Sequence, residues 1–121
     1  MSKSVLLVDY NPNLLLLLAD FLKSFGLKVY TAESIEKGWQ VYTEAQPDLI
    51  VSDIALKSKD CGYRFLKQVR DRDLQQPFIF LSALNNSINR NIAMRLGANA
   101  YIDKPFEPDE LYRKIKSILS F

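Results

Sequence analysis

Residues 47–53 of the chain read Pro-Asp-Leu-Ile-Val-Ser-Asp. The apolar run in this stretch is too short for a helix and ends on a carboxylate, which predicts a buried strand that carries Asp53 to the edge of a sheet. In open parallel sheets, ligands bind outside the carboxyl ends of the strands. We therefore expect Asp53 to lie where a ligand binds.

Three other apolar runs end on or near a reactive side chain: residues 5–8 before Asp9, residues 78–81 before Ser82, and residues 101–102 shortly before Lys104. Helical patterns separate the runs, so strand and helix alternate five times, which predicts a parallel sheet with helices on both faces. Right-handed crossovers place the loops that follow these strands on one edge of the sheet. We therefore expect the three side chains to join Asp53 in one site.

The expected elements follow from apolar periodicity and from turn residues. Strands are predicted at residues 5–8, 28–31, within 47–53, at 78–82 and at 100–102, and helices at residues 13–25, 34–45, 63–72, 87–96 and from 108 onward. Asn11 or Asn13 is expected to cap the first helix, and Gly26 and Gly97 to take left-handed conformations at helix ends. The apolar stripe of the first helix is expected to comprise Leu14, Leu15, Leu17, Leu18, Phe21, Leu22 and Phe25, with Leu16 facing solvent.

Composition restricts the class of protein. A chain of 121 residues, 48% hydrophobic and 25% charged, fits one globular domain spanning 1–121. The net charge is +2 with scattered basic residues, so no nucleic-acid binding by this segment is expected. Because the chain has one cysteine, Cys61, and no histidine, an internal disulfide, a histidine-based triad and most zinc sites are excluded.

No membrane segment or secretory signal is expected. The N-terminus leads directly into a strand, and the leucine block at residues 14–18 is too short to cross a bilayer. The expected location is the cytoplasm, or the stroma of a plastid.

The four clustered side chains suit phosphoryl transfer. Two close carboxylates repel each other, so a proton or a cation is expected between them. Lys104 supplies one positive charge, and Mg²⁺ binds one or two carboxylates together with phosphate oxygens. An aspartate carboxylate can itself be the nucleophile and form an aspartyl phosphate.

The chain resembles the receiver domain of two-component response regulators over essentially its whole length. The matching motifs are Leu6-Leu7-Val8-Asp9, residues 47–53, Leu81-Ser82-Ala83, Gly97-Ala98 and Lys104-Pro105-Phe106. The resemblance implies an α/β, flavodoxin-like (CheY-like) fold with sheet order 2-1-3-4-5 and five helices. It also implies a signalling domain that accepts phosphate at Asp53 from a sensor histidine kinase or a phosphotransfer domain, and not an enzyme that turns over an external substrate.

The resemblance assigns a role to each site residue. Asp53 would be the phosphoacceptor, Ser82 the hydroxyl that moves towards the phosphoryl group, and Tyr101 the aromatic that moves inward behind it. Lys104 would contact the phosphoryl group from a loop with a cis bond before Pro105. The Mg²⁺ ligands would be Asp9, Asp53 and the backbone carbonyl of Ala55.

One position departs from the family pattern and leaves two interpretations open. Tyr10 stands where the family has a second acid after the first strand, so the pocket lacks one unit of negative charge and attracts Mg²⁺ less strongly. The first interpretation is a phosphorylated receiver, and the alternative is a pseudo-receiver that acts through protein contacts without phosphate. An unrelated enzyme on the same fold has less support, because residues 9–12 do not form a glycine-rich phosphate loop.

The resemblance also implies an output surface. It would be the face built from the fourth helix, the fifth strand and the fifth helix, which includes Arg90, Arg95, Tyr101 and Arg113. The family uses this face to form homodimers or to hold an output domain, and a DNA-binding output domain would lie outside this segment.

Overall fold

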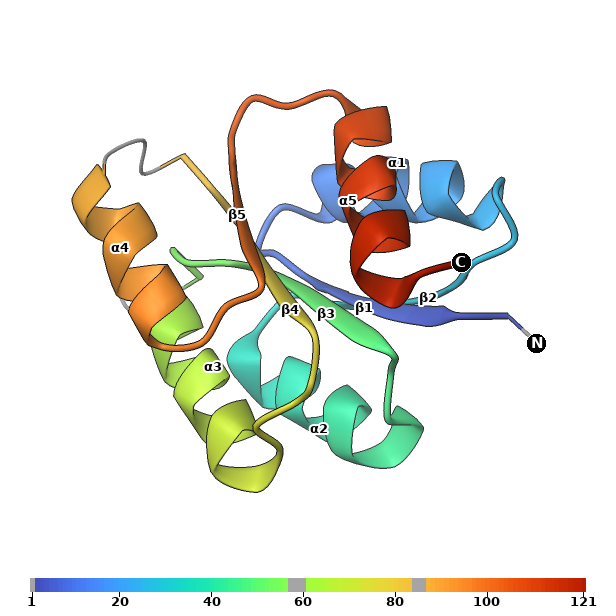
Figure 1. Ribbon diagram of the computed structural model, residues 1–121. Helices are drawn as coiled ribbons and strands as arrows, with labels where there is room; N and C mark the ends of the chain where they lie inside the picture. The colour runs from blue at the N-terminus through green and yellow to red at the C-terminus, as the bar shows by residue number, and fades with distance from the viewer. Residues whose placement is uncertain (1, 57–60, 84–86) are drawn as a thin grey trace.

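Five parallel strands form the centre of the molecule, in a computed structural model that describes residues 2–56, 61–83 and 87–121 (Figure 1). The strands are β1 (Ser4–Val8), β2 (Lys28–Ala32), β3 (Leu49–Asp53), β4 (Phe78–Ser82) and β5 (Ala100–Asp103). The helices are α1 (Pro12–Lys23), α2 (Ile35–Ala45), α3 (Cys61–Arg72), α4 (Ser87–Arg95) and α5 (Pro108–Leu119). The sheet order is β2-β1-β3-β4-β5, which confirms the predicted doubly wound fold.

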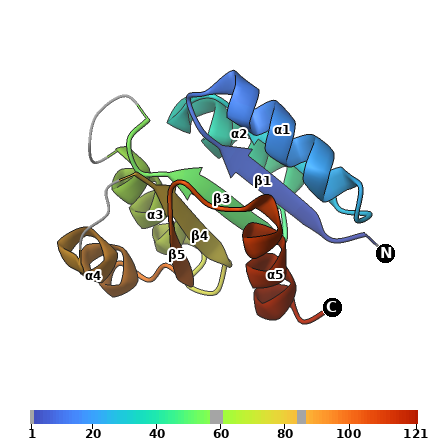
Figure 2. The ribbon, with the colours of Figure 1, turned by 90° about the horizontal axis from the view of Figure 1, so that it is seen from above.

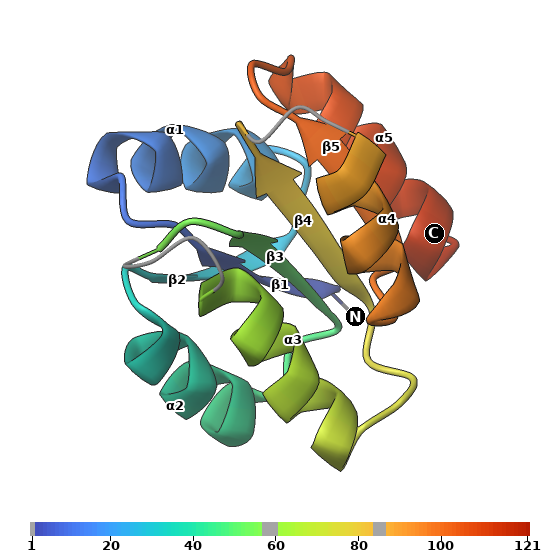
Figure 3. The same cartoon turned by 90° about the vertical axis from the view of Figure 1, so that its left-hand side faces the viewer.

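The helices cover the two faces of the sheet (Figure 3). Alternate residues of a strand point to opposite faces, so Val5 and Leu7 of β1 pack with α1 and α5, while Leu6 and Val8 pack with the side of α2, α3 and α4. The central strands β3 and β4 are buried along their whole length, as expected for strands covered on both sides. In Figure 2, α4 lies beside β5, apart from α1 and α2.

The ends of the helices follow the sequence signals. The Asn11 side chain accepts hydrogen bonds from the backbone N–H groups of Asn13 and Leu14, so Asn11 is the cap of α1. Gly26 and Gly97 have φ values of 86° and 101°, which confirms the predicted left-handed conformations. The third helix begins two residues earlier than predicted, at Cys61 instead of residue 63.

The predicted apolar stripe of α1 was partly wrong. Leu15, Leu18 and Leu22 are buried and Leu16 is exposed, as expected, but Leu17 is 58% exposed. Phe25 is 48% exposed and lies beyond the end of α1, where its ring stacks on Tyr112 of α5. Five consecutive leucines remove the periodicity that separates a buried helix face from an exposed one.

Within the described ranges, no helix is long and apolar enough to cross a membrane.

Candidate active site at the carboxyl edge of the sheet

The side chain of Lys104 joins two buried carboxylates at the carboxyl edge of the sheet. Its Nζ atom lies 2.8 Å from Oδ2 of Asp9 and 3.0 Å from Oδ2 of Asp53. Asp9 directly follows β1, Asp53 ends β3, and Lys104 directly follows β5. The fold therefore brings together three charged groups that are up to 95 residues apart in the sequence.

The remaining oxygen of each carboxylate accepts a backbone hydrogen bond. Oδ1 of Asp9 accepts from the N–H group of Asn11 at 2.9 Å, and Oδ1 of Asp53 accepts from the N–H group of Ala55 at 3.2 Å. In both turns the donor lies two residues after the aspartate, an arrangement that Asp favours at the start of a turn. These bonds fix the orientation of both carboxylates.

Burial and charge have opposite effects on the ionisation of these groups. Burial raises the pKa of Asp53, and the charge of Asp9 adds to this effect, while Lys104 and the Ala55 N–H group partly offset it. Burial by itself would lower the pKa of Lys104, but the hydrogen bonds and charges of Asp9 and Asp53 outweigh burial and raise it. Lys104 therefore remains an ammonium ion between the two carboxylates at neutral pH.

The chain segment behind Asp53 is held by close backbone packing against Gly62. The Gly62 N–H group donates to the carbonyl oxygen of Ile54 at 2.8 Å. A Cβ atom at position 62 would collide with the carbonyl oxygen of Asp53 and with Cα of Ile54. Only glycine allows the start of α3 to approach the end of β3 this closely.

Ser82 lies on β4, the strand next to Asp53, and Tyr101 lies on β5, one strand further from Asp53. Ser82 is fully buried at the end of β4, its carbonyl oxygen accepts a hydrogen bond from the N–H group of Lys104 at 2.8 Å, and it pairs with Asp103 of β5. Tyr101 is buried on the face that carries α4. The peptide bond between Lys104 and Pro105 is cis, as the resemblance implies.

The site has oxygen atoms that can bind a hard cation, but only a few of them belong to carboxylates. Asp9, Asp53 and the carbonyl group of Ala55 have the chemistry that Mg²⁺ binds, since this ion takes one or two carboxylates and keeps several waters. The structure contains no cluster of three or more His, Cys, Asp or Glu side chains within residues 2–56, 61–83 and 87–121 that would hold a metal. Tyr10 is 57% exposed and adds no carboxylate.

Two contributors to this region were not predicted from the sequence. The N–H group of Asn11 orients Asp9, and the Asp-x-Asn spacing at residues 9–11 was a local signal for this turn. Arg90 of α4 bonds to the end of β5 through Asp103, and no local signal reveals this contact, because 13 residues separate the partners.

The parallel sheet of this strand order and the acidic, lysine-bridged pocket at its carboxyl edge agree with what comparison with known proteins finds. The family model described as response regulator receiver domain matches residues 5–116 of the sequence. The alkaline phosphatase synthesis transcriptional regulatory protein PhoP of Bacillus subtilis is 34% identical over 119 residues, which cover 98% of this chain and 49% of that protein.

Solved structures agree with this match. A putative response regulator from Chloroflexus aurantiacus is 31% identical, with a TM-score of 0.90 and full coverage of both chains. A CheY-like response regulator receiver domain protein from Methanospirillum hungatei is 26% identical, with a TM-score of 0.92 over 99% of this chain and 95% of that one. The chain belongs to the response regulator receiver domain family, and it spans about half the length of the curated relatives it matches.

Proposed function

We propose that this domain accepts a phosphoryl group at Asp53 from a phosphohistidine of a sensor kinase or a phosphotransfer domain. The observation that carries the proposal is the Lys104 bridge between two buried carboxylates at the carboxyl edge of the sheet. A carboxylate oxygen of Asp53 forms a bond to phosphorus, the phosphorus–nitrogen bond breaks, and the leaving imidazole keeps the electron pair and takes up a proton. Each chain takes one phosphoryl group and turns over no external substrate.

The neighbouring groups are suited to stabilise the transferred charge. The Lys104 ammonium lies 3.0 Å from the nucleophile and neutralises phosphoryl oxygens. The Ser82 hydroxyl, on the strand next to Asp53, is the group that moves towards the phosphoryl group. Asp9, Asp53 and the carbonyl group of Ala55 would hold Mg²⁺, which supplies additional positive charge for phosphoryl transfer when bound.

An apolar groove beside Lys104 supports a role for α1 in binding the phosphate donor. Its volume is about 390 Å³, and it is lined by Leu14, Leu17, Leu18, Ala83, Lys104, Pro105, Phe106 and Pro108. Leu17, one of the residues that line this groove, is 58% exposed. Adjacent apolar groups at the mouth of a charged site suit an amphipathic helix of a partner that presents its histidine to Asp53.

We further propose that phosphorylation alters the face formed by α4, β5 and α5. This face carries Arg90, Arg95 and Arg113 together with the buried Tyr101. Its partner would be a second copy of the domain or an output domain that binds DNA.

A second candidate function is a pseudo-receiver that binds proteins without phosphate. The observation that favours it is Tyr10, because the pocket has two acids and its own lysine already bridges them. In this case the face of α4, β5 and α5 would bind its partner in the unmodified protein.

Intact mass after incubation with acetyl phosphate and Mg²⁺ separates the two functions. The wild-type protein should gain one phosphoryl group, Asp53→Ala should gain none, and Asp20→Ala, which removes an exposed acid of α1, should behave as wild type. Tyr10→Asp should lower the Mg²⁺ concentration needed for half-maximal uptake. Uptake by Tyr10→Asp alone would favour the pseudo-receiver, and uptake that persists in Asp53→Ala would contradict the assignment of the acceptor.

A further inference from the structure

Arg90 of α4 makes three different contacts with the end of β5. Its Nη2 atom lies 2.9 Å from Oδ2 of Asp103, and its Nη1 atom donates to the backbone carbonyl of Tyr101 at 3.1 Å. The guanidinium group also lies over the Tyr101 ring, 4.9 Å from its centroid. The planar guanidinium group thus contacts the ring of Tyr101, the backbone carbonyl of Tyr101 and the carboxylate of Asp103 on the same strand. A lysine side chain cannot make these three contacts together.

The residue before Arg90, Asn89, connects α4 to α3. The hydroxyl group of Tyr63 on α3 donates to Oδ1 of Asn89 at 2.8 Å, and the Tyr63 ring packs edge-on against Phe80 of β4. Phe80 pairs with Tyr101 in the sheet. Asn89 and Arg90 therefore connect the first half of α4 to α3 and to β5.

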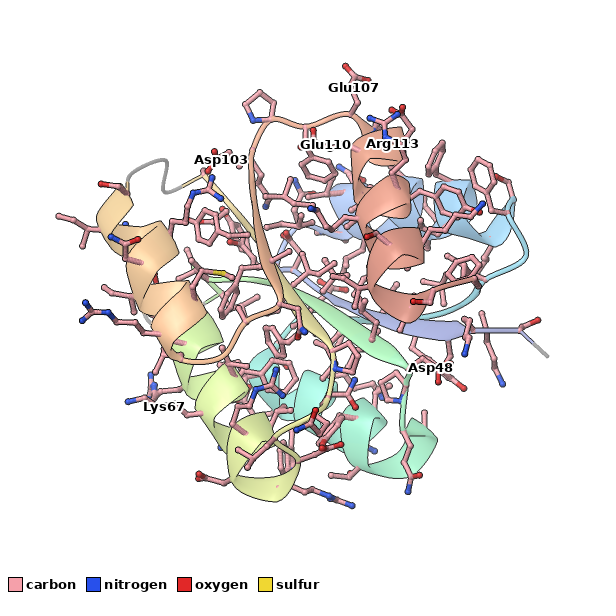
Figure 4. All side chains as sticks on the ribbon, viewed as in Figure 1. Asp48, Lys67, Asp103, Glu107, Glu110 and Arg113 are labelled. Atoms are coloured by element: carbon pink, nitrogen blue, oxygen red, sulfur yellow. The ribbon has the colours of Figure 1, made fainter. Side chains whose placement is uncertain are left out.

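The strand end that Arg90 holds belongs to the active site. Asp103 pairs with Ser82 across β4 and β5, and the next residue is Lys104, which bonds both carboxylates. Figure 4 shows Asp103 at the end of β5, on the side of α4, while Arg113 lies on α5. A movement of α4 would therefore act directly on the segment that positions Lys104.

We propose that Arg90 is a positioning residue that holds Tyr101 in its buried orientation and couples α4 to the strand end carrying Lys104. This inference rests on the proposed function in one respect, namely that Tyr101 and α4 form the part of the domain that responds to phosphate. Release of the Tyr101 ring then requires the loss of its contact with the Arg90 guanidinium group, which the bonds to the Tyr101 carbonyl and to Asp103 hold over the ring, in addition to a movement at Ser82. The ion pair with Asp103 is half exposed and is screened by salt, whereas the contacts with Tyr101 depend less on salt.

The test follows Tyr101 directly in the unmodified protein. Ring signals of Tyr101 and amide hydrogen exchange of α4 are measured by NMR in wild type, Arg90→Ala, Arg90→Lys and Asp103→Asn. Arg72→Ala is the matched control, because it removes another arginine that lies over a tyrosine ring, 5.7 Å from the ring centroid of Tyr42. Arg90→Ala should shift the Tyr101 ring signals towards values of an exposed tyrosine and speed exchange in α4 at least tenfold.

The other variants separate positioning from a general loss of stability. Arg90→Lys keeps the charge but loses the paired donors, so it should give a smaller shift of the same kind. Asp103→Asn keeps the ring and carbonyl contacts and should leave Tyr101 buried, with α4 exchange less dependent on salt than in wild type. Tyr101 signals in Arg90→Ala that match those of wild type and Arg72→Ala would overturn the inference, even if Arg90→Ala unfolds more easily.

Phosphate uptake, measured on the same samples, tells the two proposals apart. The Tyr101 measurement needs no phosphate, so absence of uptake in wild type would contradict the proposed function and leave the positioning result intact. If both hold, Arg90→Ala should take up phosphate from acetyl phosphate at a rate that differs at least threefold from the rates of wild type and Arg72→Ala. If Tyr101 is displaced in Arg90→Ala but the rate of phosphate uptake stays that of wild type, the proposed coupling of α4 to Lys104 is wrong.

Discussion

Lys104 is the residue whose charge makes the pocket stable. It neutralises two carboxylates that are almost fully buried, so its removal would leave like charges facing each other without compensation. Lys104→Met keeps the length and the apolar stem of the side chain while removing the ammonium group. The folded protein would then have to bury two unpaired charges.

We expect Lys104→Met to lower the free energy of unfolding at pH 7 by roughly 3 kcal/mol, as for other partly buried pairs that lose one partner. The loss should shrink as the pH falls and Asp53, whose pKa is raised by burial, takes up a proton. The folded pKa of Lys104 is raised, so its stabilising effect is complete below the unfolded value of 10.5 and disappears as the pH rises through the folded pKa. Urea denaturation at pH 4 and pH 7 checks the dependence on acid, and an equal loss at both values would contradict it.

Asp53 is expected to reduce the stability of the unmodified protein. Its folded pKa lies above the unfolded value of 3.8, so the folded state binds more protons between the two values and stability falls as the pH rises through this range. Asp53→Asn removes this effect and should stabilise the domain at pH 7 by roughly 0.5–2 kcal/mol. Urea denaturation at pH 7 measures this, with Asp20→Asn as a control at an exposed aspartate. If Asp53→Asn is less stable than wild type, the ion pair of Asp53 with Lys104 stabilises the protein by more than burial of the Asp53 carboxylate destabilises it.

At the scale of the elements, the junction of β3 and α3 determines how Asp53 is presented. Gly62 is needed there because a side chain would collide with backbone atoms of residues 53 and 54. Gly38, within α2, differs because a Cβ atom would meet side-chain atoms of Val8 and Phe65, the nearest at 3.2 Å. Side chains can adjust by a few tenths of an ångström, whereas the backbone at the end of a central strand cannot.

Gly62→Ala should therefore lower the free energy of unfolding by roughly 1–3 kcal/mol and reduce phosphate uptake, because the strand end must move. Gly38→Ala should change stability by less, since the better helix propensity of alanine offsets the tighter packing by about 0.5–1 kcal/mol. Thermal unfolding and acetyl phosphate labelling of both variants provide the comparison. If the two variants lose the same stability and take up the same amount of phosphate, the backbone contact at Gly62 does not determine how Asp53 is presented.

At the scale of the whole molecule, α4 presents an apolar surface that is not covered within the described structure. Ile88 and Ile92 are 69% and 39% exposed and lie four residues apart, so they share one face of the helix. If phosphorylation produces a dimer through α4, β5 and α5, Ile88→Glu should weaken it at least tenfold. Leu74→Glu alters an exposed leucine just beyond α3 and should leave the dimer unchanged. Sedimentation velocity with and without acetyl phosphate measures both, and a dimer that resists Ile88→Glu would exclude this surface.

The sequence predicted the order of the elements well, because each buried strand is a short apolar run that ends on a polar group. It also placed Asp9, Asp53, Ser82 and Lys104 at one edge, since crossover handedness determines which loops meet. It did not predict the exposure of Leu17, because a block of five leucines has no periodicity. It did not predict the contacts of Arg90 either, because they depend on how α4 packs beside β5.

The claim that Asp53 is the phosphoacceptor can be tested by borohydride reduction after treatment with acetyl phosphate. Borohydride reduces an aspartyl phosphate to homoserine and releases phosphate, so the position of homoserine in the sequenced peptides identifies the modified aspartate. We predict homoserine at position 53 in the wild-type protein, and none in a sample that received no acetyl phosphate. Homoserine at Asp9 instead, or at no aspartate, would contradict the claim.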